Sequence, residues 1–315
     1  MKRWLVRLFG VLVLLVIGAL ALAWTPDRDP SELRAKYADA HSQFVDLGGG
    51  LTVHVRDEGP RDAPVLVLLH GSSASLQTWD PWVRRLAGRY RVIRYDQPGH
   101  GLTGPHPRGD YRAEAFVDAL DRLTTKLGAP RFVLAGNSMG GWVAWNYALA
   151  HPDRLRGLVL VDAAGAPDSA PSRLPIGFRI ARSPFAPVMD HFTPRWIVAK
   201  SVHQSMAVQG VITPAMIDRY WELLLYPGNR KATRERFGTP REDATPATMQ
   251  RLHMPVLLLW GEQDRLVPVA AGHWFAKEIP GATLVTFPDV GHIPMEETPD
   301  ASAKALAAWM DKLPA

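Results

Sequence analysis

The sequence predicts an α/β protein: a mostly parallel sheet flanked by helices, with an inserted helical cap and a hydrophobic helix before the fold. Three features indicate this architecture. Apolar runs typical of strands covered on both faces alternate with helical patterns along most of the chain. Residues 131–150 join one such run to an apolar helix through a turn bounded by glycines. Between residues 165 and 252 the alternation stops and helical fragments replace it, which indicates an insertion.

The first elements form a hairpin and the beginning of the sheet. Residues 43–47 and 51–56 alternate in polarity about the turn Gly48-Gly49-Gly50, which is typical of an antiparallel hairpin. The elements that follow are predicted as a strand at 65–69, a helix at 79–88, a strand at 91–95 and a helix at 112–127. This is the pattern of an alternating α/β sheet.

The second half continues the sheet on both sides of the inserted segment. Further strands are predicted at 132–135, 155–161, 255–260 and 282–287, and a closing helix at 301–310. Residues 42–164 and 253–315 would form the core, with residues 165–252 as a helical cap over the edge of the sheet where ligands bind. The cap residues expected to offer an apolar surface are Trp196, Met206, Met216, Trp221, Leu223, Leu224 and Leu225.

Residues 1–24 differ in composition from the rest of the chain. Basic residues at positions 2, 3 and 7 precede a stretch at 8–24 without a charge, which is long enough for a bilayer span. We expect a retained membrane anchor that holds the rest of the chain on the non-cytoplasmic side. The alternative is a signal peptide with the cleavage pattern Ala21-Leu22-Ala23, which would give a secreted or periplasmic protein. Residues 25–41 follow as a linker in which a short polar helix can form.

The composition excludes several kinds of chemistry. The chain has 315 residues and no cysteine, so disulfides, thiolate catalysis and Cys-ligated zinc are excluded. The histidines lack the pairwise spacing of metal ligands, and we expect no metal. The net charge of +5 comes from dispersed Lys and Arg residues rather than from basic clusters with aromatics. We therefore expect no nucleic-acid partner.

The segment Gly136-Asn137-Ser138-Met139-Gly140 has the pattern of a nucleophile elbow, a tight strand-to-helix turn that exposes a serine hydroxyl. Backbone and side chains approach closely on both sides of such a turn, so only glycine fits at positions 136 and 140. The helix that follows has unpaired N–H groups in its first turn, where an oxyanion would be stabilised. Ser138 is therefore the candidate nucleophile.

A serine hydroxyl needs a general base within hydrogen-bond reach, and that base needs a carboxylate to orient it. His292 follows the last strand and a glycine, and a helix comes after it, so it is expected at the same edge of the sheet as Ser138. Two aspartates are candidates for the acid, because Asp264 and Asp162 both follow strands that end at this edge. Asp264 is preferred.

From about residue 43 to the C-terminus the chain resembles the capped α/β-hydrolase superfamily, in its serine-nucleophile branch. The motifs that carry the resemblance are His70-Gly71-Ser72, Asp96-Gln97-Pro98-Gly99-His100-Gly101, Gly136-Asn137-Ser138-Met139-Gly140-Gly141, His151-Pro152-Asp153-Arg154, Gly261-Glu262-Gln263-Asp264 and Gly291-His292. The resemblance implies a catalytic triad of Ser138 as nucleophile, Asp264 as acid and His292 as base. It also implies an oxyanion hole formed by the N–H groups of Ser72 and Met139.

The expected activity is hydrolysis of carboxylic esters through an acyl-enzyme, without a cofactor. The hydrophobic N-terminus and the cap are similar in layout to membrane-anchored monoacylglycerol-lipase-like members. This similarity implies medium-chain or monoacylglycerol-type esters as substrates and a membrane partner through the N-terminal helix. Three alternatives stay open: a C–C bond hydrolase of ring-fission dienol-ketones, a cofactor-free haloperoxidase-like esterase, and a non-catalytic ligand-binding relative.

Overall fold

An eight-stranded sheet runs through the centre of the computed structural model, in the order β1-β2-β4-β3-β5-β6-β7-β8. The structure describes all residues except 1–3, 5–6, 15–17, 19–23, 168–173 and 315. β1 (Ser42–Asp46) pairs antiparallel with β2 (Thr52–Glu58), which pairs antiparallel with β4. The parallel strands are β3 (Val65–Leu69), β4 (Arg91–Tyr95), β5 (Phe132–Asn137), β6 (Leu155–Val161), β7 (Val256–Gly261) and β8 (Thr283–Phe287).

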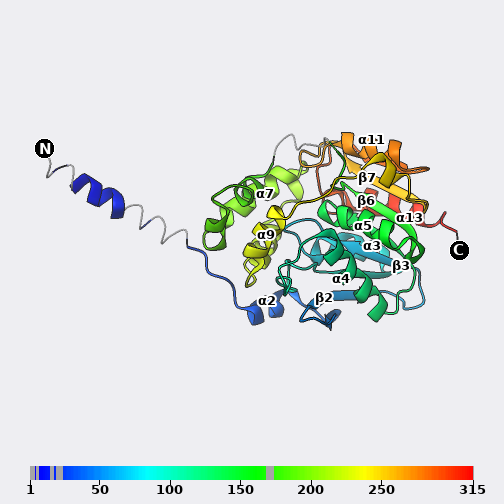
Figure 1. The fold of residues 1–315 in the computed structure, drawn as a ribbon, viewed down its shortest axis with the longest axis horizontal. Helices are drawn as coiled ribbons and strands as arrows, with labels where there is room; N and C mark the ends of the chain where they lie inside the picture. Colours follow the sequence, from blue (N-terminus) through cyan, green and yellow to red (C-terminus); the bar gives the residue numbers. More distant parts are fainter. Residues whose placement is uncertain (1–3, 5–6, 15–17, 19–23, 168–173, 315) are drawn as a thin grey trace.

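Helices cover both faces of the sheet, which explains why β5 and β7 are buried at every position (Figure 1). Successive strand residues point to opposite faces, so that Leu66 and Val67 of β3 belong to different hydrophobic clusters. One face packs against α4 (Ala113–Lys126), α5 (Met139–Ala150) and α11 (Val269–Glu278). The other face packs against the 3₁₀ helix η1 (Leu76–Trp79), α3 (Asp80–Leu86), α12 (Pro294–Glu297) and α13 (Pro299–Met310).

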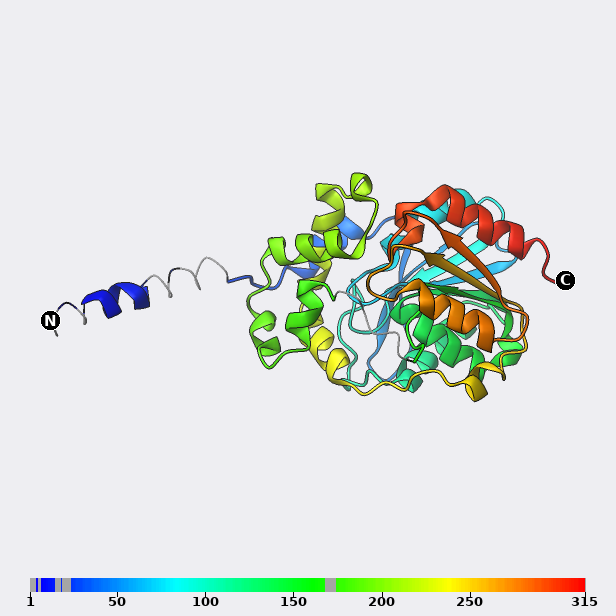
Figure 2. The same cartoon turned by 90° about the horizontal axis from the view of Figure 1, so that it is seen from above.

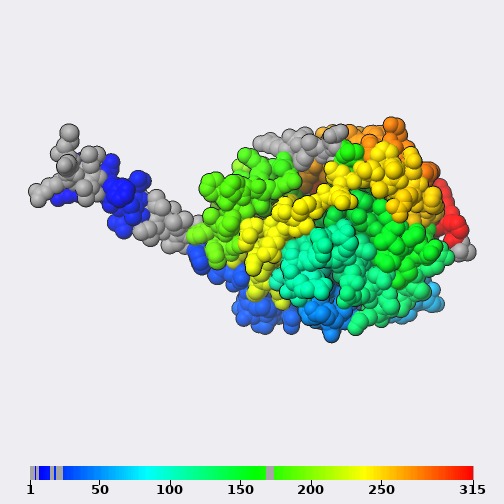
Figure 3. All heavy atoms as spheres, viewed as in Figure 1, coloured from blue at the N-terminus to red at the C-terminus, as the bar shows by residue number. Residues whose placement is uncertain are grey.

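A group of short helices lies between β6 and β7 in the sequence, and we call this segment, residues 165–252, the cap. Figures 1 and 2 place the helices of residues 176–238 together beside the sheet rather than on either of its faces. The last short helix, at residues 246–249, instead packs near α11 of the core. In Figure 3 the chain from α9 to α10, drawn in yellow, runs across the surface of the core. The elements are α6 (Ile176–Ala181), η3 (Ala186–Asp190), α7 (Arg195–Ser205), η4 (Gln209–Val211), α8 (Pro214–Leu224), α9 (Asn229–Gly238) and α10 (Pro246–Met249).

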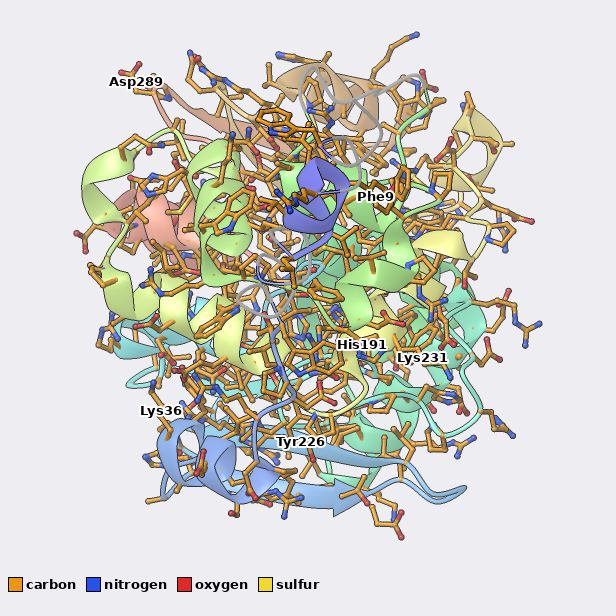
Figure 4. The ribbon with its side chains drawn as sticks, turned by 90° about the vertical axis from the view of Figure 1, so that its left-hand side faces the viewer. Phe9, Lys36, His191, Tyr226, Lys231 and Asp289 are labelled. Atoms are coloured by element: carbon orange, nitrogen blue, oxygen red, sulfur yellow. The ribbon has the colours of Figure 1, made fainter. Side chains whose placement is uncertain are left out.

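The segment that precedes the core is docked on the cap. It contains α2 (Pro30–Tyr37), whose Lys36 and Tyr37 side chains each donate a hydrogen bond of 2.7 Å to Glu222 of α8. On the neighbouring helix, Arg230 donates to the carbonyl of Thr25 at 2.7 Å. Figure 4 looks onto the cap and shows α2, with Lys36, along its lower edge. The chain from residue 25 to residue 37 therefore joins core and cap.

The N-terminal stretch was predicted to span a membrane, and the described part of the chain does not support this. Within the described part of the chain, no helix has the length and apolar character needed to cross a bilayer. The prediction of a membrane-anchored protein held by residues 1–24 is therefore wrong. Residues 1–3, 5–6, 15–17 and 19–23 of that stretch lie outside the described residues.

Candidate active site

Ser138 occupies the turn between β5 and α5, in a backbone conformation that non-glycine residues rarely adopt. Its φ is 55° and its ψ is −117°, and such conformations cost on the order of 1–3 kcal/mol. Hydrogen bonds of 3.0 Å hold this backbone: the Ser138 N–H donates to Val161, and the Ser138 carbonyl accepts from Trp142 and Ala164. The turn is therefore fixed by the neighbouring strand as well as by its own helix.

The glycines of the elbow are required by close contacts. A Cβ on Gly136 would collide with the carbonyl oxygen of Gly140, and a Cβ on Gly140 would collide with the carbonyl oxygen of Leu69. The predicted need for glycine at both positions is confirmed. A Cβ on Gly71 would lie 3.1 Å from the Cβ of Ser138, so the loop after β3 also passes directly beside the candidate nucleophile.

His292 and Asp264 form a buried hydrogen bond. The distance from His292 Nδ1 to Asp264 Oδ2 is 2.7 Å. The other oxygen, Oδ1, accepts the N–H groups of Leu266 and Val267 at 2.7 and 3.1 Å, which fixes the carboxylate in the loop between β7 and α11. Because an ionised carboxylate can only accept, Nδ1 carries the proton and Nε2 is left as an acceptor. Nε2 is the atom that a general base needs.

Ser138, His292 and Ser72 line one chamber between the edge of the sheet and the cap. Its empty volume, part of which is open to solvent, is about 1000 Å³. The cap side of the chamber is mainly apolar. It consists of Phe178, Ala181, Ala186, Met189, Ile197, Val198, Val202 and Leu224, with Thr193, Arg230, Thr233 and Arg234 among the polar residues.

The apolar wall differs from the one predicted from residue types. Of the predicted cap residues, Leu224 lines the chamber. Trp196 is 59% exposed and points to solvent, whereas the next residue on α7, Ile197, lines the chamber. Neighbouring residues on a helix differ by about 100° in direction. Trp196 was predicted to line the chamber because it is apolar, but the sequence did not show which face of the helix is buried. Trp221 instead donates its Nε1–H to the carbonyl of Thr193 at 2.8 Å.

The two predicted oxyanion-hole residues follow neighbouring parallel strands. Ser72 lies in the loop after β3 and lines the chamber, and Met139 is the first residue of α5, directly after β5. The N–H groups in the first turn of a helix have no partner within that helix. The arrangement thus brings two backbone donors towards one edge of the sheet, although the Met139 side chain itself is buried.

Asp162 lies close to the His292–Asp264 pair but has a different environment. Its Oδ1 accepts the N–H of Gly261 at 2.9 Å, and the side chain is fully buried. The potential ligand atoms of Asp162, Asp264 and His292 lie within 4.8 Å of one another, a set that could hold a cation. Burial and the nearby Asp264 carboxylate raise the pKa of Asp162 well above its usual range. A raised pKa favours the protonated carboxyl group, which suits a hydrogen-bond donor better than an orienting carboxylate.

The motif at residues 96–101 builds the loop next to the chamber rather than a proton-transfer group. Asp96 Oδ2 binds His54 Nδ1 at 2.8 Å and the N–H of Leu102 at 2.9 Å. His70 Nε2 accepts the N–H of Gln97 at 3.0 Å, and burial lowers the pKa of His70. A neutral histidine with both ring nitrogens engaged has a structural role.

Sequence reasoning missed two buried glutamates that follow His292. Glu296 and Glu297 occupy the end of α12 and are 6% and 5% exposed. Both accept hydrogen bonds from the cap. In the sequence these residues are visible only as two adjacent glutamates in a short segment between the candidate base and the closing helix. They were not singled out because glutamates are rarely buried.

Comparison with known proteins shows the family to which the fold belongs. A family model described as alpha/beta hydrolase fold matches residues 64–299. The chain is 29% identical over 307 residues to the dihydrolipoyllysine-residue acetyltransferase component of the acetoin cleaving system from Cupriavidus necator, covering 91% of this chain and 77% of that protein.

Two solved structures resemble the chain over most of its length. One is a membrane phospholipase A described as a bacterial virulence factor, with 26% identity, a TM-score of 0.73 and coverage of 99% of this chain and 98% of that chain. The other is a thermophilic esterase from Thermogutta terrifontis, with 28% identity, a TM-score of 0.71 and coverage of 87% and 99%. Since the family model spans most of the chain, including strands β3 to β8, the elbow and the cap, this protein belongs to the α/β-hydrolase fold family.

Proposed function

We propose that the protein hydrolyses carboxylic esters through an acyl-enzyme formed on Ser138. The observation that carries this proposal is the 2.7 Å bond between His292 Nδ1 and Asp264 Oδ2, on a histidine that lines the same chamber as Ser138. This arrangement leaves Nε2 of His292 to accept the proton of a serine hydroxyl. Two similar structures, named an esterase and a phospholipase A, support the choice of an ester as substrate.

In the proposed reaction, Ser138 Oγ attacks the ester carbonyl while His292 Nε2 accepts its proton. The negative charge on the carbonyl oxygen accepts hydrogen bonds from the N–H groups of Ser72 and Met139. His292 then gives the proton to the leaving alcohol, and the acyl group stays on Ser138. A water molecule, deprotonated by His292, attacks this acyl group. His292 then returns the proton to Ser138 Oγ as the bond to the acyl group breaks and the carboxylic acid leaves. Asp264 holds the imidazole and stabilises its charged form.

The apolar cap wall supports an alkyl chain as the acyl part of the substrate. Phe178, Ile197 and Val198 face the same chamber as the nucleophile. An acyl chain placed against them would lose contact with water. Burial of each CH₂ group would stabilise the complex by about 0.8 kcal/mol. We therefore infer a medium-chain ester, with a monoacylglycerol-type ester as one natural form.

The test of the proposed function is replacement of the nucleophile. Ser138→Ala should lower kcat for p-nitrophenyl octanoate by on the order of a thousandfold or more, because no other hydroxyl replaces Oγ at the elbow. Circular dichroism should show an unchanged fold. A serine-reactive phosphonate should label the wild type at Ser138 and leave the Ser138→Ala variant unlabelled. Hydrolysis within tenfold of the wild type would move the chemistry to another residue.

A further inference from the structure

The loop that carries His292 is held on both sides by one buried carboxylate. Glu297 Oε2 accepts the N–H of Gly291 at 3.0 Å, and Glu297 Oε1 accepts the N–H of Ile293 at 3.0 Å. These two residues flank His292 directly. The carboxylate therefore fixes the backbone from which the imidazole projects, from a position behind the chamber.

The same carboxylate also holds the cap. Glu297 Oε2 accepts the N–H groups of Ala207 and Val208 at 2.7 and 2.9 Å. Both residues belong to the connection between α7 and η4. Bonds from N–H groups to a carboxylate are stronger than those between neutral groups. One side chain thus joins the base loop and the cap through four backbone donors.

A second contact joins the same two segments without Glu297. The N–H of His292 itself donates to the carbonyl of Ser205, the last residue of α7, at 3.1 Å. The cap passes so close that a Cβ on Gly291 would lie 2.6 Å from the N of Ala207 and 3.0 Å from the carbonyl oxygen of Ser205. Glycine at position 291 is therefore required by the cap as well as by the loop.

We propose that Glu297 is a positioning residue that holds His292 in its working orientation and makes this orientation depend on the closed cap. The inference rests on the proposed role of His292 as the base. A catalytic group must be placed within about 0.5 Å of its productive position. If residues 205–208 move away from the core, Glu297 loses the donors of Ala207 and Val208, and the His292 N–H loses its acceptor. The base is then ordered only when the cap covers the chamber.

The neighbouring glutamate provides a matched control. Glu296 is buried to a similar degree and also binds the cap, through Arg219 at 2.7 Å and Tyr220 at 2.9 Å, and it accepts the hydroxyl of Thr78. The hydrogen-bond partners of the Glu296 side chain lie on α8 and η1, whereas those of Glu297 include the base loop. Loss of Glu296 therefore removes buried hydrogen bonds to α8 and η1 but leaves the bonds of Glu297 to residues 207, 208, 291 and 293 in place.

The test compares Glu297→Gln with Glu296→Gln. The glutamine keeps one acceptor oxygen and points an NH₂ group at backbone donors. We expect Glu297→Gln to lower kcat for p-nitrophenyl octanoate by about tenfold to a hundredfold, with KM changed by less than about threefold, because misplacement of about 1 Å can cost about a hundredfold. In the free protein, the downfield proton resonance of the His292–Asp264 hydrogen bond should broaden or disappear. Glu296→Gln should keep that resonance and stay within about threefold of the wild-type kcat.

A second variant removes one cap donor and leaves Glu297 intact. Val208→Pro deletes a single N–H, and the φ of −79° at Val208 is close to that of proline, about −65°. Its kcat should fall several-fold, with a weakened downfield resonance. Should Glu297→Gln fail to fold, this variant decides the question.

Two results would overturn the proposal: an unchanged resonance and kcat in Glu297→Gln, or equal losses in Glu297→Gln and Glu296→Gln. The resonance does not depend on turnover. A wild type that hydrolyses no ester would therefore contradict the proposed function and still allow this inference to be judged.

Discussion

At the scale of single residues, the surroundings of His292 give two aspartates different properties. Asp264 accepts two backbone N–H groups and is hydrogen-bonded to the imidazole. Asp162 accepts one backbone N–H and is fully buried. Burial and the neighbouring carboxyl group of Asp264 raise the pKa of Asp162. The geometry therefore gives the contact with the imidazole to Asp264 and the raised pKa to Asp162.

This difference predicts which aspartate matters for turnover. Asp264→Asn should lower kcat for p-nitrophenyl octanoate by on the order of 10⁴, because the amide holds His292 in the wrong tautomer. Asp162→Asn should stay within about tenfold of the wild type, since asparagine is neutral, can donate a hydrogen bond, and tolerates a positive φ. Steady-state kinetics of the two variants measure the difference. Equal or reversed losses would assign the acid role to Asp162.

The raised pKa of Asp162 also predicts a dependence of stability on pH. Below the pKa of the unfolded chain, about 3.9, Asp162 is protonated in both states. As the pH rises above that value, the unfolded state ionises and the folded state does not, so the stability contributed by the group is lost progressively. The Asp162→Asn variant does not lose this stability as the pH rises, because asparagine does not ionise. Its free energy of unfolding relative to the wild type should therefore increase between about pH 4 and pH 7, as measured by urea titration; a constant difference would contradict the raised pKa.

At the scale of elements, the sheet and the elbow could be predicted because their signals are local. The runs in β3, β5, β6 and β7 are apolar at nearly every position, and glycine, serine and glycine recur at fixed spacing in one turn. The order of Ser138, Asp264 and His292 after successive strands then placed them at one edge of the sheet. The bond between the last two is the geometric consequence.

The cap elements could be predicted as helical but not in their orientation. α7 shows the reason: Trp196 faces solvent and Ile197 the chamber, and a helix of 11 residues with weak segregation of apolar side chains does not reveal its buried face. Tertiary packing decides it. The same holds for α12, whose Glu296 and Glu297 find partners 77 to 90 residues away in the sequence. No local pattern encodes such distant contacts.

The linker shows a similar limit of local patterns. A short polar helix before the first strand was predicted, and α2 occupies residues 30–37. Its docking depends on hydrogen bonds from Lys36 and Tyr37 to Glu222, which is 186 and 185 residues away from them in the sequence. A segment assigned as a spacer therefore contributes to holding the cap.

At the scale of the whole molecule, the site is assembled from both halves of the core and from the cap inserted between them. Ser72 and Ser138 precede the insertion, and Asp264 and His292 follow it, while Ile197 comes from within it. The membrane anchor predicted for residues 1–24 is the exception. A run without charges indicates what a segment can do in a bilayer, but no helix in the described part of the chain is long and apolar enough to span one.

The shape of the chamber leads to the last prediction, which concerns chain length. On the protein lacking residues 1–24, kcat/KM for p-nitrophenyl esters should rise several-fold for every two carbons from acetate towards octanoate, since each buried CH₂ contributes up to about 0.8 kcal/mol to transition-state binding. The rise should stop where the chain outgrows the cap wall. Ala181→Trp, at that wall, should move the optimum to shorter chains and leave acetate hydrolysis nearly unchanged, whereas Trp196→Ala, on the solvent side of α7, should not move it. If the wild type cleaves the acetate ester fastest, the proposed binding of an alkyl chain by the cap wall is wrong. If it cleaves a ring-fission dienol-ketone faster than any ester, the proposed activity is C–C bond hydrolysis rather than ester hydrolysis.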